Sequence, residues 1–506
     1  MADEDEWSSD ANQAINISFV QPSAQGPKTL SKFHPKYTFP IFGDEERIFG
    51  YQDLSIHLRF AAHDLQPNVE ISYDRKFKAV GETKAMGIEE TLREYLPPYA
   101  FDKISRFNAK VQDDSSAKDF KPPGEFVRKY TSRSRHFEIW CGELTDPAVQ
   151  RLIERIQVLI LFFIDGGTML ALDDQEWSIS RWRVFFVYEK LTNPPTPTAS
   201  PYSIVGYSTS YRFLSYTPSA TSSPSKSKPP PQDFPFPPAQ PISPSSLPSR
   251  DRISQFLILP PHQSHSHGSH LYNAMYHTFH ASPTTTEFTV EDPNEAFDNL
   301  RDYCDYTRLL ANGTFSKITL HTSLPPALTS KRPGVRVPTS SLLDLPLLES
   351  LRQQNKIAPR QFARLVELYL LSTIPPHNRQ AGTARLTQRA KASDEADRAY
   401  YYWRLLVKQR VYKRNKDQLM QLDRVDRIDK VEETVGELVG DYERLLRGLE
   451  ARKGGEAAVN GGGGKRERGK RKVVDDEEEE KDGERGAHGD AEGRRGVKRS
   501  RPSNVS

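Results

Sequence analysis

Cysteine is scarce in this chain of 506 residues, which contains only Cys141 and Cys304. Two cysteines cannot build a disulfide framework, and so few of them fit a reducing compartment. Charge of one sign is lacking too, because 70 Lys and Arg residues face 67 Asp and Glu residues and leave a net charge of +3. A balance this even excludes no class of partner.

The chain also lacks a long hydrophobic run. Its most apolar segment, VLILFFI (158–164), is far shorter than the roughly 20 residues that span a bilayer. The segment extends the amphipathic pattern of residues 147–157, so we expect one buried helix over 147–164. The N-terminus MADEDEWSSD is acidic and polar, unlike a signal peptide. We therefore expect a soluble intracellular protein that does not contact membranes.

Composition and periodicity divide the chain into four parts. Residues 1–134 mix strand and helix patterns and predict an α+β domain. Residues 135–336 predict a mixed α/β core. A Pro- and Ser-rich insertion at 217–249 interrupts it, and we expect this stretch to be disordered between two neighbouring antiparallel strands. Residues 337–452 predict a helical domain, and residues 453–506 a disordered tail of charge blocks.

A strand, a polar turn and a helix follow one another at 253–280. Residues 253–259 (ISQFLIL) are apolar and rich in β-formers, and Leu271, Met275 and Phe279 recur at a helical spacing of four. A strand that enters a helix through a turn of small residues points backbone N–H groups and a helix N-terminus at one place. Such a place binds phosphate.

The turn matches a Q-x-x-G-x-G pattern in which Ser266 replaces the first glycine, between Gln263 and Gly268. Serine is a preferred N-cap, so we expect a negative φ at Ser266 and a hydroxyl that caps the helix. The alternative is a positive φ, which costs serine roughly 1–2 kcal/mol. A side chain at Gly268 is expected to enter the space of a bound pyrophosphate.

Four histidines lie in the same turn, at His262, His265, His267 and His270. Metal ligands must converge in a defined number, no cysteine is near, and the spacing matches no zinc pattern. We favour a polar turn without metal and keep metal binding as the alternative.

A carboxylate follows the next predicted strand, in TVEDPNEAF. Asp292 as N-cap, Pro293 at the first helical position and Glu295 two residues later form a capping box. That pattern leaves Glu291 unexplained. A charged residue at the carboxyl end of a strand often faces a ligand crevice, although simple exposure to solvent is the alternative.

These stretches resemble the catalytic subunits of type B histone acetyltransferases, a branch of the GCN5-related N-acetyltransferase superfamily. The resemblance rests on RISQFLILPPHQSHSHGSHLYNAMY, TVEDPNEAFDNLRD, FPIFGDEERIFGYQDLSIHL and APRQFARLVELYLL, and it covers about residues 18–446 outside the insertion. It implies an acetyltransferase core with an N-terminal α+β domain and a C-terminal helical domain. It also implies acetyl-CoA as cosubstrate, no metal, and Glu291 as general base. The residues it implies for the cofactor are Phe256, Leu257, Ile258, Gln263, Ser264, His265, Ser266, His267, Gly268, Ser269 and Asn294.

Two positions depart from the family pattern and bear on cofactor affinity. Ser266 replaces a usual glycine, and Tyr303 stands where some relatives carry an arginine. Cys304 could act as an acyl carrier, but a buried thiol in the core is the simpler interpretation.

The substrate that the family implies is a lysine in the basic N-terminal tail of free histone H4, in a GxGKxG context and with histone H3 as its companion. Acidic and aromatic residues are candidates to line its groove, although each alone is explained by surface exposure. They are Asp44, Glu45 and Glu46, and Asp173, Asp174, Glu176 and Trp177. The family also implies a WD40-repeat histone chaperone as partner, and we expect no direct contact with DNA.

We therefore predict a histone acetyltransferase of cytoplasm and nucleus that supports chromatin assembly, silencing and DNA repair. One alternative acetylates protein N-termini or small amines, and another is a non-catalytic histone-chaperone scaffold. The basic clusters KRERGKRK and VKRSRP predict nuclear import, with a merely solubilising tail as the alternative.

Overall fold

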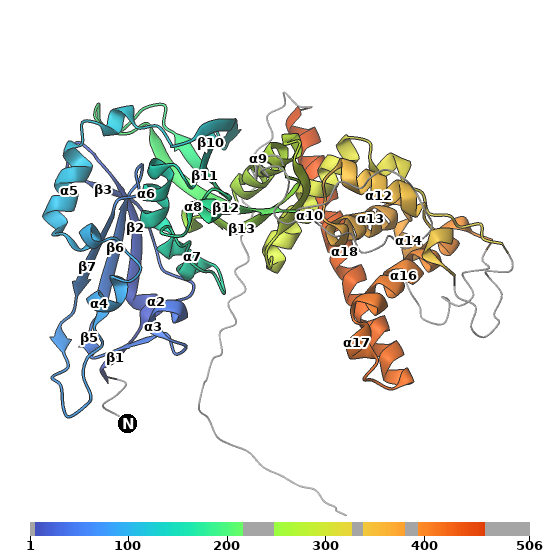
Figure 1. Ribbon diagram of the computed structural model, residues 1–506, viewed down its shortest axis with the longest axis horizontal. Helices are drawn as coiled ribbons and strands as arrows, with labels where there is room; N and C mark the ends of the chain where they lie inside the picture. The colour runs from blue at the N-terminus through green and yellow to red at the C-terminus, as the bar shows by residue number, and fades with distance from the viewer. Residues whose placement is uncertain (1–5, 216–246, 326–336, 380–392, 461–506) are drawn as a thin grey trace, which may run out of the picture. The chain divides into compact units, whose positions relative to one another are not determined.

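The structure of the chain is a computed structural model that describes residues 6–215, 247–325, 337–379 and 393–460 (Figure 1). The described residues up to Ala451 form one compact unit. Within the described ranges, no helix is both long and apolar enough to cross a membrane. The mixture of sheets and helices confirms the predicted α+β class. The division at residues 134 and 336 stays a prediction, and most of the predicted insertion and tail lies outside the described residues.

The N-terminal region is built on a four-stranded sheet. Its order is β3 (Lys28–Phe33), β2 (Ile15–Gln21), β6 (Ser55–Ala61) and β7 (Pro67–Ser72), with β2 and β6 parallel. Alternate side chains of β6, at Ile56, Leu58 and Phe60, are buried in the core. The other elements of this region are β1 (Ser8–Asp10), α2 (Ala11–Ala14), α3 (Phe39–Phe42), β4 (Arg47–Phe49), β5 (Tyr51–Gln52), β8 (Arg75–Lys76), α4 (Ile88–Leu92), η1 (Pro98–Phe101), α5 (Ile104–Asp113) and η2 (Ala117–Asp119).

A six-stranded sheet follows and holds the centre of the unit. Its order is β14 (Thr285–Val290), β13 (Ser249–Ile258), β12 (Tyr202–Leu214), β11 (Trp182–Lys190), β10 (Arg135–Glu143) and β9 (Glu125–Ser132). All neighbours are antiparallel except β13 and β14, which are parallel. The outer edge of β14 is covered, because the N–H group of Phe288 donates to the carbonyl oxygen of Lys356 at 2.7 Å.

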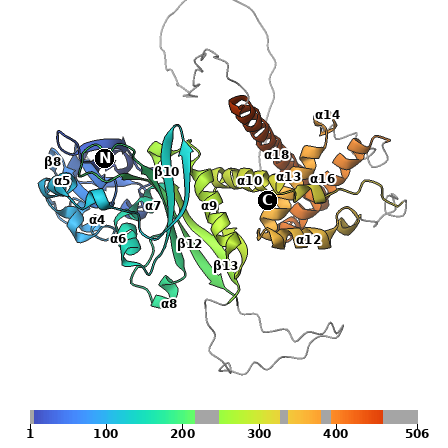
Figure 2. The same ribbon diagram turned by 90° about the horizontal axis from the view of Figure 1, so that it is seen from above.

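Helices cover both faces of this sheet (Figure 2). On one side lie α6 (Pro147–Ile156) and α7 (Val158–Phe163), and on the other α9 (His267–Ala281) and α10 (Glu295–Ala311). In β11, Phe186 joins the core on the α7 side and Phe185 the core on the α9 side. A strand that is buried on both faces reads as a continuous apolar run, as the sequence does here. The expected single helix over 147–164 is divided at Gln157 into α6 and α7.

The insertion is bounded by two paired strands, as predicted. Leu214 of β12 lies opposite Ser249 of β13, and the N–H group of Ser215 donates to the carbonyl oxygen of Pro248 at 2.8 Å. Ser249 is fully buried and also pairs with Thr285 of β14. Ser249 therefore belongs to the sheet and Pro248 borders it, so the predicted end of the insertion at residue 249 is wrong.

Replacing residues 217–246 with a short Gly/Asn turn should leave the stability of the folded unit nearly unchanged. The ends are already hydrogen-bonded neighbours, and loop length affects closure entropy only weakly. Soluble yield and thermal denaturation would measure this. A deletion that also removes Pro248 and Ser249 should be clearly less stable, and equal stability of the two deletions would contradict the assignment of Ser249 to the sheet.

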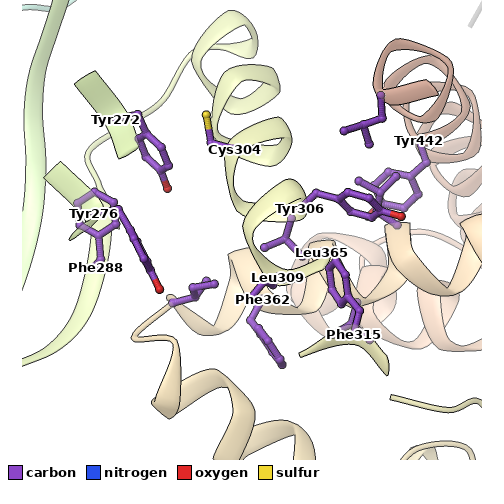
Figure 3. Packing of buried hydrophobic residues seen from close by; sticks show 14 of the residues in the cluster. Tyr272, Tyr276, Phe288, Cys304, Tyr306, Leu309, Phe315, Phe362, Leu365 and Tyr442 are labelled. Carbon is purple, nitrogen blue, oxygen red and sulfur yellow. The ribbon is translucent and has the colours of Figure 1, made fainter. Parts of the chain in front are cut away.

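The described residues from 337 onward are mainly packed helices, as the sequence predicts. The long charged stretch at 399–446 is divided near Asn415 and Asp423 rather than continuous. Figure 3 shows Tyr272 of α9, Cys304 of α10, Leu365 of α13 and Tyr442 of α18 in one buried cluster. The C-terminal elements are η5 (Phe315–Lys317), η6 (Thr339–Ser341), α12 (Leu345–Gln354), α13 (Pro359–Thr373), α14 (Pro376–Arg379), α16 (Glu395–Arg414), α17 (Lys416–Leu419) and α18 (Arg424–Asn460). Two short elements lie earlier in the chain, α8 (Glu176–Ile179) and η4 (Pro260–His262).

Buried carboxylates join these helices to one another. Asp305 accepts a hydrogen bond from the hydroxyl of Tyr272 at 3.0 Å and pairs with Arg308. Asp302 pairs with Arg364 of α13 at 2.6 Å. Burial raises the pKa of Asp302, and the Arg364 guanidinium opposes that shift. Losing one partner would leave the other charge buried and unpaired, so these pairs hold α9, α10 and α13 in fixed positions.

Candidate functional site

Strands β13 and β14 separate halfway along β13. Their pairing ends at Ile253 and Val290, where the N–H group of the next residue, Glu291, donates to the Ile253 carbonyl oxygen at 2.9 Å. Beyond Ile253, β13 pairs only with β12. A break in the register between Thr209 and Ser210 of β12 leaves Ser254 as an extra residue on β13. Such bulges re-aim a strand, and they are frequent beside active sites.

Peptide groups of β13 face the opened side. The N–H groups of Gln255 and Leu259 both donate toward β12, to Thr209 Oγ1 and to the Val205 carbonyl oxygen. Backbone groups alternate along a strand, so those of Phe256 and Ile258 point away from β12. The Ile258 carbonyl oxygen is already used, because it accepts from Nε2 of Gln263 at 2.9 Å. What remains toward the opening is a short row of backbone donors and acceptors.

The predicted turn leads into α9 at the end of this row. Ser266 is the N-cap, but its φ is 68° and its hydroxyl makes no capping bond. The expected negative φ and hydroxyl cap are therefore wrong. The position demands the left-handed conformation that glycine adopts freely, and Ser264 has a positive φ as well, of 59°. N–H groups in the first turn of a helix have no partner within the helix, so those of His267, Gly268 and Ser269 are available to an anion.

The space beside Gly268 differs from the one expected. An ideal Cβ at this position would lie 2.7 Å from Cδ1 of Leu300, 3.7 Å from Phe256 and 3.9 Å from Ile258. The missing side chain faces α10 and β13 rather than the mouth of the turn. Gly268 lets α9 approach its neighbours closely, and the expectation that a side chain there would enter a pyrophosphate space is not supported.

The four histidines form a packed and uncharged cluster. Among the described residues, no group of His, Cys, Asp or Glu is arranged to hold a metal ion. Nδ1 of His267 is hydrogen-bonded to the hydroxyl of Tyr130 at 2.7 Å, and His270 stacks on the same ring. Burial lowers the pKa of both His262 and His267 to about 4. His262 and His267 are therefore neutral at neutral pH, and the contacts of His267 and His270 with Tyr130 fix the turn against β9.

Glu291 lies where β13 and β14 separate. Its carboxylate accepts from the hydroxyl of Ser254 at 2.5 Å and pairs with the guanidinium of Arg252 at 2.9 Å. About a third of the Glu291 side chain, 36%, is exposed, so the carboxylate is held and yet accessible. Sequence reasoning missed both partners. The sequence signal was that Arg252 and Ser254 stand two positions apart on a strand, which puts both side chains on one face.

The start of α10 differs from the predicted capping box. The N-cap is Asn294, whose Oδ1 accepts from the N–H group of Phe297 at 2.9 Å. Asp292 is outside the helix and has a φ of 30°. Pro293 and Glu295 fit the capping-box spacing, which favoured Asp292 as the N-cap. Asparagine is an equally good N-cap, and Asn294 stands where the chain enters the helix.

Two regions of the chain match models of known families. Residues 7–165 match the family described as Histone acetyl transferase HAT1 N-terminus, and residues 334–374 match Fungal HAT1, C-terminal. A relative from Aspergillus fumigatus, named Histone acetyltransferase type B catalytic subunit, is 48% identical over 451 residues, which cover 88% of this chain and 78% of the relative. The chain belongs to the family of type B histone acetyltransferase catalytic subunits.

Other members of this family agree over a similar span. The protein of that name from Aspergillus oryzae is 48% identical over 90% of this chain and 88% of its own length. The one from Schizosaccharomyces pombe is 30% identical over 89% of this chain and 95% of its own length. The family makes the chain an acyltransferase, and acetyl-CoA is the donor that an acetyltransferase implies.

The residues present suit an acetyl-CoA molecule. Its pantetheine carries amide groups. The N–H and carbonyl groups of Phe256 and the N–H group of Ile258 are matching hydrogen-bonding groups on the opened side of β13. Its pyrophosphate matches the first turn of α9. The side chain of Leu257 is buried on the other face of the sheet, so only its backbone is near the opening. Cys304 is buried in the core, which confirms the structural interpretation of that thiol.

The acidic candidates lie on two surface segments. Asp44, Glu45, Asp173 and Glu176 are exposed, and 56% of Trp177 is exposed beneath the guanidinium of Arg181. Hydrogen bonds from Ser178 and from the N–H group of Gln175 lower the pKa of Asp174. Both segments attach to α7, since Lys36 and Tyr37 donate to Phe162 and Leu170 donates to Gln157.

Glu46 has a structural role instead. Its carboxylate accepts from the N–H groups of Thr38 and Phe39 and from the amide of Asn12. These bonds, that of Thr38 foremost, lower the pKa of Glu46. Glu46 thereby caps α3, and the expectation that it contacts substrate is not supported.

Ser266→Gly should stabilise the fold by up to about 1 kcal/mol. It relieves roughly 1–2 kcal/mol of left-handed strain and loses about 0.5–1 kcal/mol to the greater freedom of glycine in the unfolded chain. Acetyl-CoA affinity should change by less than about tenfold, because the hydroxyl makes no capping bond. Thermal denaturation and titration would measure the two effects. Ser269→Gly, inside α9, is the matched control and should be destabilising; a destabilised Ser266→Gly would contradict the strain.

Proposed function

We propose that this protein transfers the acetyl group of acetyl-CoA to a lysine ε-amine in the N-terminal tail of free, newly made histone H4. Three features support the proposal: membership of a family named for histone acetylation, the opened strand pair, and the accessible carboxylate of Glu291. The carboxylate is the feature that carries it, because the sheet could open for other reasons.

The chemistry explains why a base is needed. A lysine with a pKa near 10.4 is almost entirely protonated at neutral pH, so only about one in a few thousand is free to attack. Acetyl transfer forms an amide C–N bond, breaks the thioester C–S bond, and releases a proton from the amine. Glu291 takes the proton that the lysine ammonium must lose before attack, directly or through a water, and the proton released from the attacking amine is balanced by protonation of the departing thiolate through solvent. The backbone N–H groups on the opened side of β13 polarise the thioester carbonyl.

The substrate surface is proposed to be acidic. The H4 tail is basic and rich in glycine, and the exposed carboxylates Asp44, Glu45, Asp173, Asp174 and Glu176 carry the opposite charge. The loop before Asp173 is tied to the site, because Nε2 of Gln255 donates to the carbonyl oxygen of Thr168 at 2.6 Å. Histone H3, in the dimer with H4, and a WD40-repeat histone chaperone are the further partners we propose.

The decisive experiment compares acetylation of free H4, of nucleosomes, and of a peptide panel. We expect turnover on free H4 and on tail peptides with a GxGKxG sequence, and little on nucleosomes. Preference for N-terminal α-amines or small amines would favour the alternative acetyltransferase. Binding of histones without acetyl-CoA binding would favour a non-catalytic scaffold.

We propose that the protein is present in both cytoplasm and nucleus, because histone H4 is made in the cytoplasm and used in the nucleus. Acetylation of new H4 would then support chromatin assembly, silencing and DNA repair. The basic clusters KRERGKRK and VKRSRP are proposed to direct import, and both lie outside the described residues. A fluorescent fusion truncated after Arg452 should lose nuclear signal; unchanged nuclear signal would refute an import role for the tail.

A further inference from the structure

Glu291 is fastened to β13 at three points. Its N–H group donates to the carbonyl oxygen of Ile253, Arg252 binds Oε1, and Ser254 donates to Oε2. Both carboxylate oxygens are therefore engaged by residues on either side of Ile253, the last residue of β13 that pairs with β14. The side chain is fixed at the point where the strands separate.

Arg252 is itself held in place. Its guanidinium lies over the ring of Phe213 on β12, 4.4 Å from the ring centre. Its Nε atom is buried and has no hydrogen-bond partner among the described residues. An unpaired buried donor costs stability. In this arrangement the Nε donor of Arg252 stays unpaired, while the terminal nitrogens are held in one orientation toward Glu291.

Stability does not explain the pair. The side chains of Arg252 and Glu291 are 33% and 36% exposed, and ion pairs at such positions contribute roughly 0–1 kcal/mol. A pair of the same kind joins the same two strands two residues earlier, between Arg250 and Glu287 at 3.2 Å. That pair lies away from the opening, and Glu287 keeps Arg352 as a second partner.

We infer that Arg252 is a positioning residue for acetyl transfer, which holds the Glu291 carboxylate at the mouth of the β13–β14 opening. The inference rests on the proposed role of Glu291 as base. A glutamate has several rotatable bonds, and a displacement of about 1 Å at a reacting group can cost about 100-fold in rate. The guanidinium has a second consequence. An ammonium group that approaches Glu291 meets a neighbouring cation, which favours the neutral amine that attacks.

Arg252→Gln should lower kcat by about 10- to 100-fold and leave the KM for acetyl-CoA within about threefold. Arg250→Gln is the matched control and should keep kcat within about twofold, as expected for an exposed ion pair. Arg252→Lys should recover part of the loss, because it keeps the charge. Phe213→Leu removes the ring beneath the Arg252 guanidinium and should lower kcat less than Arg252→Gln does. This variant keeps the inference testable if Arg252→Gln does not fold.

A double-mutant cycle separates this inference from the proposed function. Arg252→Gln combined with Glu291→Gln should be no slower than Glu291→Gln alone, because Arg252 acts through the carboxylate. Additive losses, or equal kcat in Arg252→Gln and Arg250→Gln, would overturn the inference. Full turnover by Glu291→Gln would instead overturn the proposed base, whatever Arg252 does.

Discussion

Glu291→Gln should retain acetyl-CoA affinity and lose about 100- to 10,000-fold in kcat at pH 7, the range that general base catalysis supplies. Glutamine is nearly the same size and can still accept from Ser254, so the local structure should remain. Turnover should recover in part at alkaline pH, where lysine loses its proton without help. Steady-state kinetics between pH 7 and 10, with calorimetric titration of acetyl-CoA, would measure both effects.

The control for this variant is another carboxylate of the same region. Glu295, in the first turn of α10, is exposed and pairs with Arg444 at 3.2 Å. Glu295→Gln should leave kcat and its pH dependence unchanged. Unchanged turnover of Glu291→Gln at pH 7 would remove Glu291 from the role of base.

Gly206→Ala should destabilise the fold by about 1–3 kcal/mol, as overpacking does, and should raise the KM for acetyl-CoA by at least about tenfold. A Cβ at Gly206 would lie 2.4 Å from the carbonyl oxygen of Leu257 and 2.9 Å from Cα of Ile258. Both contacts are with backbone, which cannot swing aside as a side chain can. The alanine would push β13 away from β12 and displace the peptide groups that face the opening.

The matched control is a glycine with open space around it. Gly436 lies within α18 and has no atom within 4 Å of its ideal Cβ, so Gly436→Ala should be neutral or stabilising by about 0.5–1 kcal/mol. Denaturant unfolding and acetyl-CoA titration would compare the two variants. A Gly206→Ala protein with wild-type stability and affinity would show that β12 and β13 tolerate a wider spacing.

Much of the core was readable from periodicity. Leu271, Met275 and Phe279 are buried on one face of α9, and the strand predicted at 253–259 coincides with the second half of β13. These elements have a strong pattern because a large apolar surface is buried along one face or both. The resemblance to the family, rather than periodicity, supplied the candidate site, since contacts such as Arg252 with Glu291 join segments about 40 residues apart.

The errors fall where a few torsion angles decide the structure. Serine is a good N-cap in general, yet Ser266 is forced to a φ of 68° by a turn that its neighbours impose. Gly268 fits a phosphate pattern, but its missing side chain faces Leu300, which no local pattern connects to it. Asp292 and Asn294 are both able caps, and the geometry of the loop before α10 chose between them.

The covered edge of β14 also bears on how the protein is made. Lys356 and Ile357, which cap that edge, follow Val290 by more than 60 residues. At 5–20 residues per second, roughly 3 to 13 s of translation separate the strand from its cover. During that interval an exposed strand edge can pair with another chain. We therefore expect ribosome-bound chains that end between residues 291 and 355 to be the most dependent on chaperones. We also expect β14, which ends just before Glu291, to be the last strand of the sheet whose edge is covered.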